Sequence, residues 1–230
     1  MSSTLKEDLE GLKRISSVNI DLSHHHYLAL SFLHDWMFRK GLPAAKGVLL
    51  DYGCGGQPYR QILQKNIRRY IGADVAAAAG VELDIELEPG SPVPLPNESV
   101  NTILSTQTLE HVYDFDFYLR DCYRLLANSG CLIISVPMEW RHHEVPHDYW
   151  RFTKFGISRK LEDIGFKIED VESAGGVYIL IAQIFLDHLS ERQIYKPSIN
   201  RIINRLALWL DKRIPDANNT QTWMCIARKV

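Results

Sequence analysis

A short apolar run that ends in an acid and a glycine-rich turn constrains this chain more than any other feature. Val48–Asp51 reads as a buried strand, and Gly53 and Gly55 follow it directly, ahead of Pro58. Glycine lets the backbone approach a ligand closely, so such a turn after a strand is typical of a cofactor-binding loop. The dinucleotide fingerprint GxGxxG needs glycine where Pro58 stands, and Asp51 would repel a pyrophosphate. The segment therefore disfavours an NAD or FAD site and favours a positively charged cofactor.

Short apolar runs alternate with helical stretches from Lys46 onward. The runs are apolar at every position rather than at every second one, which indicates strands buried on both faces of a sheet. Strands that alternate with helices are typical of a doubly wound α/β fold. We therefore expect a Rossmann-like fold of seven mostly parallel strands with helices on both faces. The expected strands span residues 47–51, 69–74, 81–84, 100–105, 131–136, 168–172 and 222–228.

The length of 230 residues fits one domain with elaborations. Helical patterning precedes the first strand, and two further helical stretches, about 177–190 and 198–212, precede the last. We expect a single domain whose parts are an N-terminal helical cap over 1–45, a cofactor-binding core over 46–175, a helical insertion over 176–215 and a last strand over 216–230.

Three consecutive histidines, His24, His25 and His26, fall within the second of two helices expected in the cap. These two helices span Leu5–Ile15 and about residues 23–40. Successive residues on a helix point in different directions, so adjacent histidines there cannot form one ligand set. We expect no functional role for them.

The overall composition is that of a soluble globular protein. Lys and Arg number 26 against 28 Asp and Glu, so the charge balance calls for neither a nucleic-acid partner nor an anionic membrane. The apolar run Val177–Leu186 is about half the length that spans a bilayer, and the polar N-terminus does not resemble a secretory signal. The four cysteines lack CxxC spacing, which favours free thiols in a reducing compartment. We expect a cytoplasmic protein without an integral membrane segment.

The helix expected at 198–212 carries an apolar face. Its members are Ile199, Ile202, Ile203, Leu206 and Leu210. We expect this face to cover the protein's own core or the partner in a homodimer, and a helix lying on a membrane surface is the alternative.

The glycine-rich segment resembles the first motif of the class I S-adenosylmethionine-dependent methyltransferases. It reads Asp51-Tyr-Gly-Cys-Gly with Tyr59 following, which matches the family pattern DxGCGxxxY. The resemblance continues in register from about residue 46 to residue 172. It implies a seven-stranded Rossmann-like fold, S-adenosylmethionine as the cofactor and methyl transfer as the reaction.

Further motifs along the chain carry the same resemblance. Asp74 ends the second expected strand, about 20 residues beyond Asp51, where this family places the acid that holds the ribose hydroxyls. Asp84 falls where the family often has a residue near the adenine, and TLEHV at 108–112 is similar to the family's LEH segment. The cofactor-binding residues that the resemblance implies are Asp51, Gly53, Cys54, Gly55, Asp74, Val75, Asp84, Ser105 and Thr106.

Residues 140–153, WRHHEVPHDYWRFT, follow the fifth expected strand. His143 and His147 fit the zinc motif HExxH, but Pro146 would break the helix that this motif requires. We therefore expect no metal there. The carboxyl edge of a parallel sheet is where α/β enzymes bind substrates, so we expect this loop to handle the methyl acceptor.

A hydroxyl acceptor benefits from a general base, and histidine titrates near the operating pH. His147 with the adjacent Asp148 is the first candidate, His143 is the second, and a structural hydrogen bond that orders the loop is the alternative for His147. The run HDYWRFT resembles a subgroup often associated with sugar, polysaccharide or natural-product biosynthesis. This implies O-methylation of a small molecule such as a sugar or glycan intermediate. Methylation of an amine, or a catalytically silent protein that binds S-adenosylmethionine and serves a partner, stays open.

Overall fold

The computed structural model describes residues 14, 16–194, 196–216 and 218–230. The helix expected at Leu5–Ile15 lies almost wholly outside these residues. The sheet has seven strands in the order β3-β2-β1-β4-β5-β7-β6, which confirms the expected fold class. The strands are β1 (Val48–Tyr52), β2 (Arg69–Asp74), β3 (Ile85–Glu86), β4 (Val100–Thr106), β5 (Leu126–Pro137), β6 (Phe166–Ser173) and β7 (Thr222–Lys229).

All neighbouring strands run parallel except β7, which is antiparallel to both β5 and β6. β1 lies between β2 and β4, with Asp51 opposite Gly72 on one side and Leu104 on the other. The carboxyl ends of β1, β2, β4 and β5 therefore meet at one edge of the sheet. Loops from this edge hold most of the residues predicted to be functional.

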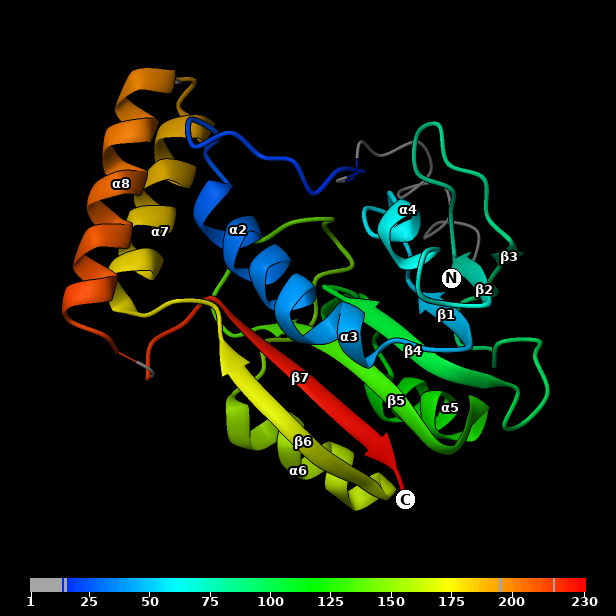
Figure 1. Cartoon of the computed structure of the whole chain (residues 1–230). Coiled ribbons are helices and arrows are strands. Elements are labelled where there is room, and N and C mark those ends of the chain that lie inside the picture. The colour runs from blue at the N-terminus through cyan, green and yellow to red at the C-terminus, as the bar shows by residue number, and fades with distance from the viewer. Residues whose placement is uncertain (1–13, 15, 195, 217) are drawn as a thin grey trace.

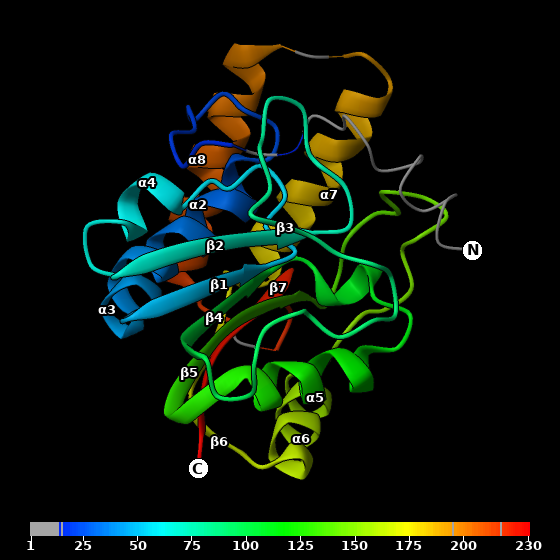
Figure 2. The same cartoon turned by 90° about the vertical axis from the view of Figure 1, so that its right-hand side faces the viewer.

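Helices cover both faces of the sheet (Figure 1 and Figure 2). α5 (Phe115–Leu125) and α6 (Lys154–Ile164) pack on one face, in a cluster that includes Leu119 and Ile157. The other face carries α2 (Tyr27–Trp36), a π-helical turn (Met37–Gly41), α3 (Leu42–Ala44) and α4 (Arg60–Leu63). Consecutive residues Leu49 and Leu50 contribute to opposite clusters, as expected for a strand buried on both sides.

Local sequence fixes the helix ends nearest the sheet edge. Asp114 accepts a hydrogen bond from the Phe117 amide at the start of α5, and Thr153 does the same for Gly156 at the start of α6. Such N-caps satisfy amide groups that have no partner inside the helix. The cap at Thr153 ends the long loop after β5 and fixes the point where that loop rejoins the sheet.

The N-terminal cap differs from the sequence expectation. The expected helix over 23–40 begins only at Tyr27, and residues 24–26 form turns stabilised by the bond from the Tyr27 amide to the His24 carbonyl. Asn200 and Asn204 of α8 (Pro197–Arg213) donate to the carbonyls of Ser23 and Leu22, so tertiary contacts hold this segment out of the helix.

The apolar face expected on the last helix is only partly covered by the rest of the chain, and Ile203 packs against residues of α2 and of α7 (Val177–Glu191). α7 and α8 pack side by side next to α2 (Figure 1). The inner side of α8 carries Asn200, Asn204 and Ala207, because the two asparagines bind backbone carbonyls. Ile202 and Leu206 are exposed instead of covering the core. In the part of the chain that the structure describes, every helix is too short or too polar to span a bilayer.

Candidate functional site

The turn after β1 brings the backbone close to two neighbouring loops. Gly53 and Gly55 adopt positive φ angles of 77° and 48°, which favour glycine. The Gly53 amide donates to the Ala73 carbonyl at 2.8 Å, and the Thr108 hydroxyl donates to the Gly53 carbonyl at 3.2 Å. A Cβ atom on Gly53 would lie 2.1 Å from the Thr108 methyl carbon, so a larger residue does not fit there.

Asp74, at the carboxyl end of β2, is held by the glycine turn. Its Oδ2 atom accepts a hydrogen bond from the Gly55 amide at 2.9 Å, and its Oδ1 atom accepts one from the Val75 amide at 2.7 Å. The side chain is largely buried. Amide donors to a carboxylate make strong, short hydrogen bonds that fix its orientation. The structure therefore brings together Gly53, Gly55, Asp74 and Val75.

Asp51 lies beneath this turn rather than in it. It is buried, and the Tyr70 hydroxyl donates a hydrogen bond to its carboxylate. Burial raises the pKa of Asp51 to about 7, and the Tyr70 hydrogen bond opposes part of that rise. Asp51 thus titrates near neutral pH and sets the charge below the glycine turn.

Asp84 is engaged along β2 rather than at its end. Its carboxylate accepts a hydrogen bond from the Gly72 amide at 2.8 Å and lies 3.7 Å from an Arg60 nitrogen. The Asp84 amide donates to the Gly72 carbonyl at 2.9 Å. These contacts hold the segment before β3 against the sheet. A role for Asp84 near an adenine stays a prediction.

The remaining predicted cofactor residues lie in two environments. Ser105 is buried, and its hydroxyl is 2.8 Å from the Tyr118 hydroxyl inside the core. Thr106 ends β4 half-buried at the sheet edge. Cys54 is buried in the turn, and burial raises the pKa of its thiol well above the ordinary range. Of these three residues, Thr106 is the one whose side chain is neither buried in the turn nor part of the core.

Arg14 joins the two halves of this edge. Its guanidinium lies 3.0 Å from Asp74 Oδ2 and 3.1 Å from Glu144 Oε2, which belongs to the loop after β5. Burial alone would lower the pKa of Arg14, but the charges of Asp74 and Glu144 outweigh that effect and raise it. Sequence analysis missed this residue, because a single arginine in a polar segment carries no motif.

The loop after β5 packs onto the 3₁₀ turn Leu109–His111, which follows β4. Glu110 is fully buried, both its carboxylate oxygens lack a hydrogen-bond partner among the described residues, and burial raises its pKa to about 8. The Glu110 carbonyl accepts bonds from the Tyr149 and Trp150 amides. The imidazoles of His111 and His143 lie 4.6 Å apart. Glu110, His111 and His143 therefore form one titratable cluster.

Asp148 pairs with His143 and Arg151 instead of His147, contrary to the expected pair. Arg151 donates to both Asp148 oxygens at 2.6 and 2.8 Å, and the His143 Nδ1 atom lies 3.4 Å from Oδ2. Burial would raise the pKa of Asp148, but the hydrogen bonds from Arg151 and the His143 amide hold it at about 2. The His147 Nδ1 atom is 3.1 Å from the Tyr149 hydroxyl, and the His147 carbonyl lies 2.8 Å from His111 Nδ1. The backbone bends at residues 144–147, so the side chains of 147 and 148 diverge.

The segment spelling HEVPH contains no helix, so it lacks the arrangement by which HExxH binds zinc. Among the residues that the structure describes, two other groups have donor atoms close enough for a metal ion, within 4.8 Å of one another. One is the cluster of Glu110, His111 and His143. The second joins His25 and His26 to Asp187 of α7.

A cleft of about 250 Å³ adjoins this loop. It lies between residues 139–141, α7 and Gln221, which directly precedes β7. The amides of Gln183 and Gln221 line it, and both side chains are buried. Their Nε2 atoms donate within the protein, to Asp187 and to the Ile179 carbonyl. Their Oε1 atoms are buried and lack hydrogen-bond partners among the described residues.

Comparison with known proteins agrees with this geometry. Residues 50–134 match the family model described as "Methyltransferase domain". The matched part of the chain, 85 of its 230 residues, is therefore similar to a methyltransferase domain. The match covers the end of β1, all of β2, β3 and β4 and most of β5, together with the glycine turn, Asp74 and the Glu110 segment. The cofactor of this domain is S-adenosylmethionine.

The curated relatives cover the same region. A protein of Mycolicibacterium smegmatis named as a probable S-adenosylmethionine-dependent methyltransferase is 27% identical over 135 residues, 53% of this chain and 52% of that protein. A ubiquinone biosynthesis O-methyltransferase of Sinorhizobium fredii is 26% identical over 38% of this chain and 40% of that protein. The chain thus spans about half the length, or less, of these relatives.

Solved structures match over nearly the whole fold. A methyltransferase from Archaeoglobus fulgidus superimposes with a TM-score of 0.56 at 16% identity, covering 88% of this chain and 94% of its own. The (4+2)-cyclase SpnF superimposes with a TM-score of 0.58 at 19% identity, covering 99% and 92%. A methyltransferase and a cyclase share this fold, so the fold alone does not fix the reaction.

The residues at the turn fit S-adenosylmethionine. The Asp74 carboxylate is fixed by two amides and already attracts one cationic donor, Arg14, so it can accept hydrogen bonds from ribose hydroxyls. Gly53 and Gly55 carry no side chain and adopt positive φ angles, so the backbone of the turn can approach a ligand closely. Asp51, buried beneath the turn, would repel a pyrophosphate when it is ionised.

The buried Glu110 makes stability depend on pH. Its folded-state pKa of about 8 lies above the ordinary value of 4.5, so the unfolded chain loses this proton at lower pH than the folded protein. Wild type should therefore lose stability as pH rises from about 5 to 8. Glu110→Gln has no titratable group at this position. The difference in unfolding free energy between the variant and wild type should therefore shift in favour of the variant by about 1 kcal/mol or more from pH 5 to pH 8. Urea unfolding of both proteins at the two pH values tests this, and a constant difference would contradict it.

Proposed function

We propose that this chain transfers the methyl group of S-adenosylmethionine to an oxygen nucleophile of a small molecule, such as a sugar or glycan intermediate. One observation carries the proposal. The Arg14 guanidinium contacts Asp74 beside the glycine turn and Glu144 in the loop after β5. One guanidinium thus bridges the glycine turn, where the cofactor would bind, and the loop after β5, where the acceptor would bind. Methyl transfer between two bound molecules requires such proximity.

The cofactor-binding side of the proposed site consists of the glycine turn, Asp74 and Val75. S-adenosylmethionine supplies an electrophilic methyl group when bound. Asp74 would orient the ribose, and Asp51, Cys54 and Thr106 would shape the surroundings. The chain's main contribution is alignment, because holding two reactants in a productive geometry supplies a large share of a rate enhancement.

His143 is better placed than His147 to act as the general base. It lies beside Asp148 in the half-buried cluster with Glu110 and His111. Burial and the neighbouring His111 lower the pKa of His143, so its imidazole is neutral at pH 7. Its Nδ1 atom lies 3.2 Å from the Arg141 carbonyl, which favours the tautomer with the proton on Nδ1. The Nε2 atom then carries the lone pair that would accept the proton of an acceptor hydroxyl.

The cleft beside this loop supports a polar acceptor. Gln183 and Gln221 line it, and the buried amide oxygens of both side chains have no hydrogen-bond partner among the described residues. A polyhydroxylated molecule supplies hydrogen-bond donors, whereas a purely hydrocarbon surface would leave both oxygens unsatisfied. This favours a sugar or a related hydroxylated metabolite.

The proposal is tested with methyl-labelled S-adenosylmethionine and a panel of acceptors. The panel contains sugars and nucleotide sugars, and for each an amino analogue that differs at one position. We expect S-adenosylhomocysteine and labelled product in equal amounts with a hydroxylated acceptor. Label transferred only to the amino analogues would show N-methylation. Binding of the cofactor without turnover on any acceptor would favour a silent protein that serves a partner.

Arg14 competes with the ribose for Asp74. Replacing it by glutamine removes a largely buried cation from the carboxylate while preserving a polar side chain. The ligand-free protein then loses its interaction between Arg14 and Asp74, which contributes about 1 kcal/mol. Affinity for S-adenosylmethionine should therefore rise roughly 3- to 10-fold. Calorimetric titration of Arg14→Gln measures this, with Arg159→Gln on the surface of α6 as a control. A fall in affinity would instead show that Arg14 holds the cofactor.

A further inference from the structure

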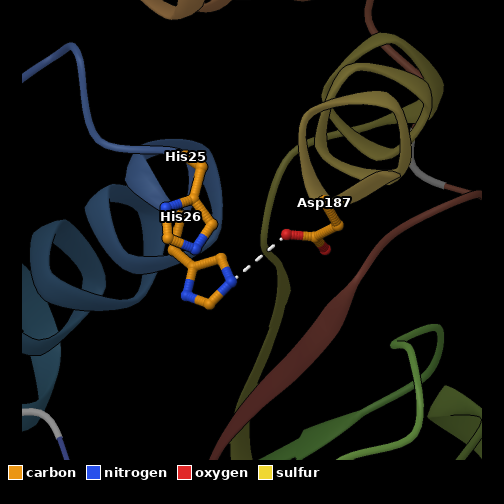
Figure 3. A group of neighbouring side chains, drawn as sticks. All are labelled: His25, His26 and Asp187. Carbon is orange, nitrogen blue, oxygen red and sulfur yellow. Dashed lines mark ion pairs between the residues drawn. The ribbon is translucent and has the colours of Figure 1, made fainter. Parts of the chain in front are cut away.

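A second group of potential metal ligands comes from segments of the chain that lie well before and well after the glycine turn. His25 and His26 stand in the turn before α2, and Asp187 lies on α7. Figure 3 shows His26 facing Asp187 across the gap between the two elements, with His25 beside His26. The donor atoms of all three lie within 4.8 Å of one another. A helix at these histidines would have prevented this arrangement, and the turn permits it.

The contact between His26 and Asp187 has an unusual character. The His26 Nε2 atom is 3.2 Å from Asp187 Oδ1, yet this buried nitrogen makes no hydrogen bond with any described residue. Two donors bound to one tetrahedral zinc ion at about 2.0–2.1 Å lie about 3.3 Å apart, which is close to the separation observed.

A buried amide fixes the group from behind. Gln183 Nε2 donates to Asp187 Oδ1 at 2.9 Å and to the His25 carbonyl at 3.0 Å, so one side chain holds both elements in place. Residues that orient metal ligands in this way raise metal affinity. Trp140 packs against His26 with ring centroids 5.4 Å apart.

The charge of the group favours a cation. Asp187 is buried and carries one negative charge against two imidazoles that are neutral when unprotonated. Arg141, whose charge acts on His25, pairs with Glu191 at 2.8 Å. A divalent ion would balance the carboxylate and satisfy His26 Nε2. Two imidazoles and a carboxylate suit Zn²⁺, and a water molecule can complete four-coordination.

We propose that His25, His26 and Asp187 bind one Zn²⁺ ion that ties the segment before α2 to α7. Asp187 also lines the cleft described above, so the ion would lie at its wall. The proposal does not depend on methyl transfer.

The test is calorimetric titration of the whole chelator-treated chain with ZnCl₂, paired with Co²⁺ absorption. His143→Asn serves as the background, because it removes the other group that has suitable donors. We expect one equivalent of zinc in this background, and a tetrahedral Co²⁺ spectrum. Adding Asp187→Asn should lower zinc affinity at least 10-fold, since it keeps the shape but removes the charged ligand. Adding His188→Asn, next along α7 and outside the group, should leave affinity unchanged.

Thermal unfolding supplies a second measurement. Zinc should raise the unfolding temperature of the background protein and of the His188→Asn protein, because a ligand that binds only the folded state stabilises it. His26→Gln should lose this rise, and it replaces Asp187→Asn if that variant does not fold. Equal zinc affinity with and without Asp187, or no zinc binding in the background protein, would overturn the proposal. The first result would mean that adjacent histidines bind metal adventitiously.

Discussion

Asp74→Asn is expected to lower affinity for S-adenosylmethionine roughly 10- to 100-fold. The substitution keeps the size of the side chain but removes the charge that strengthens hydrogen bonds from the ribose hydroxyls. Hydrogen bonds to charged groups contribute about 1.5–3 kcal/mol, which sets the expected range. The loss of charge also releases Arg14, which lies 3.0 Å from Oδ2, and this release moderates the effect. Calorimetric titration of both proteins with S-adenosylmethionine measures the difference.

The matched control for Asp74→Asn is Asp116→Asn. Asp116 lies in the first turn of α5 and pairs with Lys160 on the surface, away from the glycine turn. Its substitution should leave cofactor affinity within about twofold, as surface pairs contribute little to stability. Equal affinities for Asp74→Asn and wild type would show that the ribose is held elsewhere.

His143→Gln is expected to lower turnover about 100-fold or more with little change in cofactor affinity. General-base catalysis supplies effects of that size, and glutamine cannot accept the proton. His147→Gln, in the same loop, should have a smaller effect, because the His147 Nδ1 atom lies 3.1 Å from the Tyr149 hydroxyl while Asp148 binds Arg151 and lies beside His143. Initial rates with saturating cofactor and an acceptor found in the panel measure both variants.

The pH dependence of wild type gives an independent check of His143. Burial and His111 lower its pKa, so the unprotonated base persists below the usual histidine range. The rate should therefore fall on the acid side at a pH below about 6.5, and the His143→Gln variant should lack this limb. If His147→Gln loses the limb and His143→Gln keeps it, the assignment of the base is wrong.

The sheet and the glycine turn were predictable because local sequence encodes them. Strands such as Val48–Tyr52 are apolar at nearly every position, which indicates burial on both faces without reference to distant residues. The spacing from Asp51 to Asp74 follows from one strand, one short helix and the next strand, so the acid arrives beside the turn in any fold of this class.

The features that the sequence did not predict depend on contacts between distant segments. Asp148 was expected to serve the adjacent His147, yet Arg151 and His143 hold it because the loop bends between them. His25 and His26 leave the expected helix because α8 binds the backbone carbonyls before and beside them. Arg14 reaches Asp74 across 60 positions, and no local pattern encodes such a contact.

The most direct test of the central claim is titration of the wild-type chain with S-adenosylhomocysteine and, separately, with NADH. The acidic glycine turn and the fixed Asp74 carboxylate predict one binding site per chain for S-adenosylhomocysteine and no measurable binding of NADH. Tight binding of NADH, with no heat from either S-adenosylhomocysteine or S-adenosylmethionine, would contradict the account.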